Sequence, residues 1–563
     1  MAPLTALAAV LCLSIPHVSA QLNNSFYTVW SSVVFTRTGE RTPAVFNPNP
    51  TVLTALGAQQ AYAAGSYLRS RYLGQYTGNG VGTAPIFGLN PDSVNIEQVY
   101  VGSPDYQYTA ATAQAFLQGF YPPSNTSTTL SNGTQVEGPL GGYQYPLIQT
   151  YSFNDPESVF LNAQINCPAF DYVIETYEGS QALTDLADST ASIYQAVGEA
   201  LLQGIVPSNV WSAYEAWPIW DYLNYQNNYD VNVSAVLSSK AFSDPATGTP
   251  YLDLLGWYAS ELINGWYGNL NAINNVTDQD FSAAIGSVST IAGNFLASQI
   301  LGQLQAAVQT QGQSYKLNLL FGDFQPLMSL FALTSLNTWD SNFLGIPEFA
   351  STAVFELFSY TDGTGDAAFP SDLNDLFVMF YFQNGTTGQY QAYPLFQLGP
   401  DSTSLSWPDF ENEFYSIIPG TPADWCTECG ASSPFCPSST PSSSTSSQKI
   451  SPAIAGVIGA LVALVFAALL FAAFMLFAGV RLHRTHGRPN DAGGYKGSRK
   501  LASDTDLVIP KGGAVVSAEE TPGSPPRGGH ERVGSWELKQ KSEVVDEVHD
   551  LAWQRPVVPV ERV

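Results

Sequence analysis

The stretch Val33-Val-Phe-Thr-Arg-Thr-Gly-Glu-Arg-Thr-Pro43 joins an apolar β-type segment to a compact loop that carries two arginines. The β-branched and aromatic residues that end at Phe35 predict a buried strand over residues 26–36. Guanidinium groups such as those of Arg37 and Arg41 hold forked anions with paired, charge-assisted hydrogen bonds. The loop therefore predicts an anion pocket at the end of the first strand.

The pattern Arg-x-Gly-x-Arg-x-Pro after a strand resembles the signature of the histidine acid phosphatases, the phytase-like branch 2 of the histidine phosphatase superfamily. In that family a histidine follows the first arginine, attacks phosphorus and becomes phosphorylated. Thr38 stands at that position here. Because a threonine hydroxyl without a nearby base does not replace this nucleophile, the resemblance implies a phosphate pocket that lacks its reactive centre.

The resemblance covers about residues 26–430 and includes further family positions. Tyr108 stands where the family has a third phosphate-binding arginine. Gly322 stands where the family has the histidine of a His-Asp pair, and Asp323 keeps the acid that protonates the leaving oxygen. The family-equivalent positions are Arg37, Thr38, Arg41, Tyr108, Gly322 and Asp323, and the candidate binding residues among them are Arg37, Arg41 and Asp323.

The resemblance implies an α/β fold, in which a doubly wound phosphoglycerate-mutase-like sheet domain carries an inserted α-helical cap domain. We expect the sheet domain over about residues 26–150 and 310–420, and the cap over about residues 150–310. In the first part, small and apolar residues at helical spacing predict a helix over residues 55–73 with Thr54 as its N-cap. After residue 150, long amphipathic segments rich in aromatic residues predict the helices of the cap.

Two apolar segments predict export and membrane anchoring. Residues 1–20 form an apolar run closed by small residues, which is typical of a cleaved secretory signal peptide. Residues 453–480 are 28 uncharged, mostly apolar positions, more than the ~20 that one transmembrane helix needs. Arginines follow this span at once, so the positive-inside rule puts residues 481–563 in the cytoplasm. We expect a single-pass type I protein of the plasma membrane or a secretory-pathway membrane, and a fungal member of the family.

The segments that flank the span are low in complexity. Residues 437–452 are rich in Ser, Thr and Pro and predict an extended stalk. Residues 481–563 are rich in Gly, Pro and Ser with mixed charge, which predicts a disordered tail whose cytoplasmic partners are unknown.

Residues 21–436 are then an extracellular or lumenal domain. Six N-x-Ser/Thr sequons predict that it is N-glycosylated, at Asn23, Asn125, Asn132, Asn232, Asn275 and Asn384. Its four cysteines, Cys167, Cys426, Cys429 and Cys436, predict two disulfides in an oxidising compartment. Three pairings are open, and we expect Cys429–Cys436 as a short loop with Cys167–Cys426 as a long clasp. A zinc site is a poorer match because this domain has no histidine, and we expect no metal and no other cofactor.

The outer domain is strongly acidic. Residues 21–450 hold 35 Asp and Glu against 7 Lys and Arg, whereas residues 481–563 hold 12 against 13. Such a surface repels nucleic acid, which we exclude as a partner, and it slows the approach of polyanionic substrates. Solubility at low pH is the simpler interpretation of this acidity.

The positions of the histidines decide between an enzyme and an inactive relative. The chain has five, His17, His483, His486, His530 and His549, so none lies in the exported domain. Neither the family's phosphohistidine chemistry nor a Ser-His-Asp triad is available there. We expect a pseudoenzyme, a cell-surface glycoprotein that binds or senses a phosphate-like or other small anionic ligand. Two alternatives stay open: an acid phosphomonoesterase with an atypical site, and a structural or adhesive surface glycoprotein.

The two arginines of the loop have two alternative roles of equal weight. They can still hold a phosphate, sulfate or carboxylate ligand. They can instead pair with Asp323, Asp105 or Glu40 now that no phosphate occupies the pocket. Asp323 is the partner that we expect.

Overall fold

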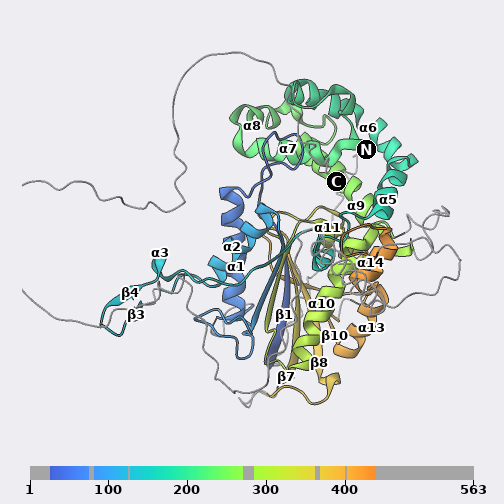
Figure 1. The fold of residues 1–563 in the computed structure, drawn as a ribbon. Helices are drawn as coiled ribbons and strands as arrows, with labels where there is room; N and C mark the ends of the chain where they lie inside the picture. The colour runs from blue at the N-terminus through green and yellow to red at the C-terminus, as the bar shows by residue number, and fades with distance from the viewer. Residues whose placement is uncertain are drawn as a thin grey trace, which may run out of the picture. The chain divides into compact units, whose positions relative to one another are not determined.

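The computed structural model describes residues 26–74, 82–124, 127–270, 285–361, 368–399 and 402–437, and they form a mixed α/β fold with one large central sheet (Figure 1). The strand order is β10-β8-β7-β1-β6-β2-β5, and β9 pairs with β8. The strands are β1 (Phe26–Arg37), β2 (Val99–Pro104), β5 (Gln149–Tyr151), β6 (Leu317–Gly322), β7 (Thr352–Thr361), β8 (Leu376–Gln383), β9 (Gln391–Tyr393) and β10 (Ser404–Ser406). The pairs from β1 to β5 are parallel, and those on the other side of β1 are antiparallel.

Helices cover both faces of this sheet. Successive residues of a strand point to opposite faces, so Val33 and Phe35 of β1 enter one core while Val34 enters the other. The first core lies under α10 (Ile291–Gln309), α11 (Gln325–Leu333) and α13 (Trp407–Ile417), and the second under α1 (Ala55–Tyr72) and α2 (Gln107–Phe120). Burial on both faces explains why β1 is a continuous apolar run rather than an alternating one.

The predicted helix after the arginine loop is confirmed. It begins at Ala55, and Thr54 is its N-cap, with the side-chain oxygen accepting a hydrogen bond from the N–H of Gly57 at 2.9 Å. Such a bond satisfies one of the four N–H groups that a helix leaves without a partner at its start.

The described residues of 156–270 and 285–309 form helices and the turns that join them, and no strand is described among them. The longer helices are α5 (Pro168–Glu178), α6 (Gln181–Val197), α7 (Ala216–Tyr229), α8 (Val231–Leu237) and α9 (Tyr251–Tyr267), and they gather beyond one end of the sheet (Figure 1). We call these five helices the cap. α10 falls inside the range that we expected for the cap but packs on the sheet, because Leu296, Ile300 and Leu304 lie in its core.

The remaining elements are short. They are the hairpin of β3 (Ser127–Thr129) and β4 (Gln135–Glu137), and the helices α3 (Pro139–Gly142), α4 (Val159–Asn162), α12 (Leu336–Trp339) and α14 (Pro422–Cys429).

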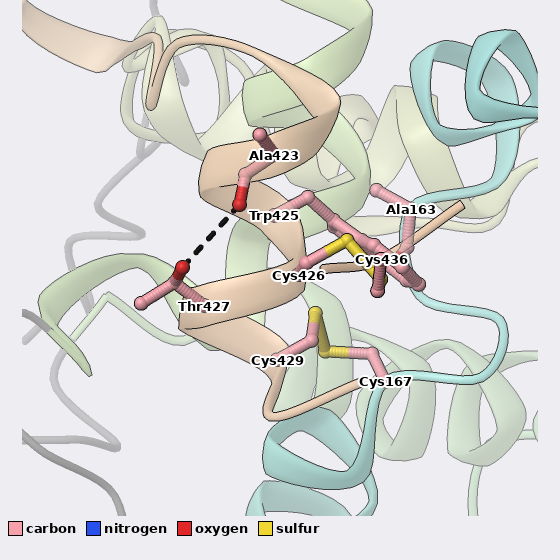
Figure 2. Close-up of a disulfide and its surroundings, with 8 residues drawn as sticks. All are labelled: Ala163, Cys167, Ala423, Trp425, Cys426, Thr427, Cys429 and Cys436. Carbon is pink, nitrogen blue, oxygen red and sulfur yellow. Dashed lines mark hydrogen bonds between the residues drawn. A yellow bond between two sulfur atoms is a disulfide. The ribbon is translucent and has the colours of Figure 1, made fainter. Parts of the chain in front are cut away.

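The two disulfides differ from the expected pairing. Cys429 bonds to Cys167 at the start of α5, and Cys426 bonds to Cys436 (Figure 2). The prediction of Cys429–Cys436 with Cys167–Cys426 is therefore wrong. Gly430 ends α14 in the left-handed region at φ 61°, and the next N–H donates to the carbonyl of Cys426. The chain thus turns back along the helix and meets Cys426 rather than Cys429.

Several sequence predictions fall on residues outside the described part of the chain. These are the signal peptide 1–20, the span 453–480, the tail 481–563, all of the stalk beyond residue 437, and the sequons at Asn23, Asn125 and Asn275. Within the described ranges, no helix combines the length and apolar character that crossing a bilayer requires. Of the other sequons, Asn132 and Asn232 are exposed, and Asn384 is half-buried.

Candidate functional site

The arginine loop begins where β1 ends, between its two neighbours in the sheet. β1 and β6 are parallel, and Arg37 lies opposite Gly322. The carboxyl ends of both strands therefore lie at the same edge of the sheet. The N–H of Thr38 donates to the carbonyl of Gly322 at 2.8 Å, which places Asp323 directly beside the loop. This is the edge at which open α/β sheets bind ligands, and it is where we expected the arginines to lie.

Two glycines let the loop lie directly against the start of α1. A Cβ added to Gly39 would come within 2.1 Å of the carbonyl oxygen of Gly57, and one added to Gly57 would come within 2.0 Å of the carbonyl oxygen of Glu40. No residue with a side chain fits at either position without a shift of backbone. The glycine of the Arg-Thr-Gly-Glu-Arg motif is therefore explained by close packing of two backbones.

Two carboxylates hold the arginines. Arg37 Nε lies 3.4 Å from Asp323 Oδ1, and Arg41 Nη2 lies 3.5 Å from Asp323 Oδ2. Arg41 Nη1 also donates to both carboxylate oxygens of Asp221, at 3.2 and 3.0 Å. Asp323 is the partner that we expected from the sequence, whereas Asp105 is exposed.

Sequence reasoning missed Asp221. It lies on α7 of the cap, 180 positions from Arg41. The available signal was a single acidic residue within the otherwise uncharged, mostly apolar stretch Ala216–Leu223. That signal marks a buried acid that needs a partner, but it does not say which cation supplies the partner.

Aromatic rings enclose the two guanidinium groups. The guanidinium carbon of Arg37 lies 4.1 Å from the ring centre of Phe349 and 5.1 Å from that of Phe324. Arg41 lies 5.7 Å from the ring centre of Tyr108 and 6.0 Å from that of Trp217. Tyr108, which we expected at the position of the family's third arginine, thus contributes a cation–π contact to Arg41.

The site is closed to solvent and close to neutral. Arg37 is 1% and Arg41 2% exposed, and the side chain of Asp323 is 12% exposed. Burial lowers the pKa of Arg37 to about 10, an effect that Asp323 offsets only in part. Burial acts on Arg41 as well, but Asp221 and Asp323 together raise the pKa of Arg41 above its ordinary value. Two positive and two negative charges therefore face one another in a dry site.

Several polar atoms of the site have no hydrogen-bond partner among the described residues. They are Nε and Nη2 of Arg37, Nε of Arg41 and the hydroxyl of Thr38. Arg37 does donate through Nη1 to the carbonyl of Pro347. An unpaired buried donor costs about 1–3 kcal/mol, and such atoms are rare in native proteins. Arg37 Nε already lies 3.4 Å from Asp323, but Arg37 Nη2 and Arg41 Nε keep N–H groups that can donate to the oxygens of an anion.

The loop is also tied to the cap through Glu40. Its carboxylate accepts hydrogen bonds from Asn228 Nδ2 at 2.7 Å and from the hydroxyl of Tyr229 at 2.6 Å, both on α7. Counted from Asp221, the residues Asn228 and Tyr229 follow by seven and eight positions. All three therefore lie on one face of α7. We call the contacts of Arg41 and Glu40 with these three residues the latch.

Neither of the two positions where the resemblance implies a catalytic histidine, Thr38 and Gly322, carries an imidazole. Thr38 is fully buried without a base, and Gly322 has no side chain. A Cβ added to Gly322 would lie 2.7 Å from the ring of Phe35, so this position is packed against a bulky neighbour. In the described ranges, no cluster of His, Cys, Asp and Glu side chains is suited to hold a metal ion.

Comparisons with known proteins find acid phosphatases and a phytase among the similar chains. The chain is 25% identical over 381 residues to human (Homo sapiens) prostatic acid phosphatase, a match that covers 67% of this chain and 78% of the relative. It is 24% identical over 390 residues to lysosomal acid phosphatase of Xenopus laevis, covering 68% of this chain and 71% of the relative. A solved phytase of Klebsiella sp. ASR1 is similar with a TM-score of 0.45 and 14% identity, covering 70% of this chain and 96% of that one.

A family model matches most of the part of the chain that precedes the stalk. It is the model of the histidine phosphatase superfamily (branch 2), and it matches residues 25–379. The arginine loop, Tyr108, Gly322 and Asp323 all lie inside the matched range. The chain belongs to the histidine phosphatase superfamily, branch 2.

Proposed function

We propose that this protein is a catalytically inactive histidine acid phosphatase homologue at the cell surface, which binds a small oxyanion at the Arg37–Arg41 pair. The observation that carries the proposal is that residues 25–379, the range matched to the family, contain no histidine. The covalent phosphohistidine step needs an imidazole, and loss of a covalent nucleophile leaves only the small rate due to binding and charge stabilisation.

Asp323 is the family-equivalent position that keeps the chemistry of a nucleophile or acid. Its carboxylate faces Arg37 and Arg41 in ion pairs, and its Oδ1 accepts a hydrogen bond from the N–H of Phe324 at 2.9 Å. Because both of its oxygens are engaged with guanidinium groups, this carboxylate is not free to attack phosphorus. It therefore does not replace the missing histidines.

Anion binding is supported by the hydrogen-bond capacity that the arginines keep. Their unpaired N–H groups can donate hydrogen bonds to an oxyanion. When no anion is bound, the carboxylate of Asp221 pairs with Arg41. An entering anion displaces this carboxylate and so weakens the latch between loop and cap. Ligand binding is thereby coupled to the position of α7, which is the property that a sensor requires.

The cell-surface part of the proposal rests on the sequence. The apolar segments 1–20 and 453–480 and the sequons between them support a type I glycoprotein whose family domain lies outside the cytoplasm.

Thermal unfolding of the full-length protein with phosphate, sulfate and inositol hexakisphosphate tests the anion site, because a ligand that binds only the folded state raises the melting temperature. We expect at least one of these anions to raise it. Arg41→Lys keeps the charge but loses the forked geometry, so this variant should respond less. Lys240→Gln removes an exposed cation elsewhere and should respond like the native protein. Absence of any shift, or equal shifts in Arg41→Lys, would contradict anion binding at this pair.

A further inference from the structure

A groove of about 740 Å³ lies beside the arginine site. One wall is the segment that follows Arg41, residues 42–52, and the other wall is the face of α7 with Tyr222, Tyr225 and Gln226. Its volume is within the range of about 300–1,000 Å³ that is usual for small-ligand sites. The latch joins the same two elements, since Asp221 accepts both from Arg41 and from the N–H of Ala44 at 3.0 Å.

The groove is lined by uncharged residues. The described residues that line it are Thr42, Pro43, Phe46, Asn47, Pro48, Asn49, Pro50, Val52, Gly204, Ile205, Tyr222, Tyr225 and Gln226, and none of them is charged. They offer aromatic faces and aliphatic carbon together with amide and hydroxyl groups that both donate and accept hydrogen bonds.

This lack of charge stands out against the surrounding domain. Residues 150–310 hold 16 Asp and Glu, and Lys240 is their single basic residue. An anionic ligand is repelled by such surroundings, and a cationic ligand finds no carboxylate among the described residues that line the groove. A neutral ligand meets neither penalty.

The walls of the groove are preorganised. Pro43, Pro48 and Pro50 restrict the backbone of the loop, and the N–H of Thr42 donates to the carbonyl of Val52 at 2.9 Å. Phe46 has a φ of 59°, in the left-handed region that a bulky side chain adopts only under strain. Strained backbone of this kind is typical of functional sites. Because the loop is already ordered, a ligand loses little free energy to ordering it.

We propose that this groove binds a neutral saccharide. Tyr225 carries the argument, because its ring is half-buried at the groove and stacks on Tyr229 with ring centres 4.5 Å apart. This stacked ring is a platform for the C–H face of a sugar, while the amides of Asn49 and Gln226 match its hydroxyl groups. The amide of Asn47 instead orders the loop, since its Oδ1 accepts from the N–H of Asn49 and its Nδ2 donates to the carbonyl of Pro43. The Arg41–Asp221 ion pair, part of the latch, then fixes the distance between the two walls of the groove.

The inference stands apart from the proposed anion site, because it needs neither a ligand on Arg37 and Arg41 nor the absence of catalysis. A saccharide result and an anion result therefore succeed or fail separately.

Calorimetric titration of the full-length protein, treated to remove its N-glycans, tests the proposal. The probes are neutral hexasaccharides of the glucan, mannan and chitin types, a sulfated hexasaccharide and a proline-rich peptide. We expect at least one neutral hexasaccharide to bind, and the sulfated one and the peptide not to bind. Tyr225→Ala should weaken the affinity about tenfold, since aromatic contacts contribute about that much. Tyr62→Ala removes an exposed ring of α1 outside the groove and should leave the affinity unchanged.

Two smaller substitutions test the groove without removing a packed ring, so a loss of folding does not explain their effect. Tyr225→Phe retains the ring and should retain most of the affinity. Asn49→Ala changes an exposed side chain and should weaken binding about fivefold, the effect of one hydrogen bond. The proposal is overturned if no neutral hexasaccharide binds, if Tyr225→Ala and Asn49→Ala both bind like the native protein, or if the peptide or the sulfated sugar is preferred.

Discussion

The protein buries arginine–carboxylate pairs in two places, and the two are built differently. In the sheet domain, Arg71 of α1 donates through Nε and Nη2 to both oxygens of Glu356 at 2.5 and 2.8 Å, and through Nη1 to the carbonyl of Gly82. Tyr72 adds a hydrogen bond to Glu356 at 2.7 Å. At the arginine loop, by contrast, Arg37 and Arg41 meet Asp323 at 3.4 and 3.5 Å and keep N–H groups without partners in the described structure.

The difference separates an ion pair whose donors are all satisfied from one that keeps spare hydrogen-bond donors. A buried charge pair is tolerated when every donor and acceptor is satisfied, as around Glu356. The arginine loop keeps donors that its carboxylates do not use, although each costs free energy. We interpret them as the remains of a phosphate site whose charge is now balanced by Asp323 and Asp221.

The largest effect is expected from breaking the satisfied pair. Glu356→Ala leaves Arg71 buried without a counter-charge and should lower the free energy of unfolding by about 3–5 kcal/mol. The double variant Arg71→Met with Glu356→Leu removes both charges and should regain much of the loss. Urea unfolding followed by tryptophan fluorescence measures both, and a loss below about 1 kcal/mol in Glu356→Ala would show that the pair is not structural.

A smaller effect with a different readout is expected from Asp221→Asn. The substitution keeps the shape and removes one negative charge beside Arg41, so the site becomes net positive. The affinity for phosphate should rise about tenfold in a calorimetric titration, because a competing carboxylate is gone. Asp188→Asn makes the same charge change at an exposed position of α6 and serves as the control. Equal phosphate affinity in the two variants would refute the role of Asp221 as a stand-in for the anion.

Glu215 sharpens the comparison because, after burial, the largest influence on its pKa is another acid rather than an arginine. Burial, and then the neighbouring Glu178, raises the pKa of Glu215 above its ordinary value of 4.5. The folded pKa thus exceeds the unfolded one, so the stability that Glu215 contributes is fully present below the unfolded pKa and is lost as pH rises through the folded pKa. Relative to Glu215→Gln, the native protein should therefore lose stability as the pH rises above the ordinary value of 4.5 and through the raised folded pKa. Parallel pH profiles of the two proteins would contradict this assignment.

The smallest effect is expected from repairing the nucleophile alone. Thr38→His restores one imidazole, but Gly322 still lacks the second histidine and Tyr108 still replaces an arginine. Catalytic groups act as a unit, so hydrolysis of an aryl phosphate should stay at the background level. The minimal repair is Thr38→His with Gly322→His and Tyr108→Arg, and it needs room beside Phe35 for the new side chain. Full activity of Thr38→His would show that the other two positions do not matter.

Local pattern and family resemblance were sufficient for part of this account. The strand before Arg37 and the helix capped by Thr54 follow from their own residues, and the structure confirms both. The contact of Arg37 with Asp323 was predicted because the resemblance puts both at the carboxyl ends of strands of one sheet, and β1 and β6 indeed run side by side.

Features that depend on how distant segments meet were not predictable from the sequence. Asp221 reaches Arg41 only because α7 lies over the loop, and spacing along the chain carries no information about that placement. The predicted disulfide pairing was wrong for a similar reason, since the turn at Gly430 brings Cys436 back to Cys426. Sequence patterns indicate which residues are buried or need partners, whereas tertiary packing selects the partner.

The most direct test of the central claim is hydrolysis of p-nitrophenyl phosphate by the native full-length protein at acidic pH, compared with Arg37→Ala and Asp323→Asn. If the site lacks a nucleophile, all three proteins release nitrophenol at the same background rate and none carries covalent phosphate after acid quenching. Robust turnover by the native protein that is lost in Arg37→Ala or Asp323→Asn would contradict the account and place an active phosphatase centre at this loop.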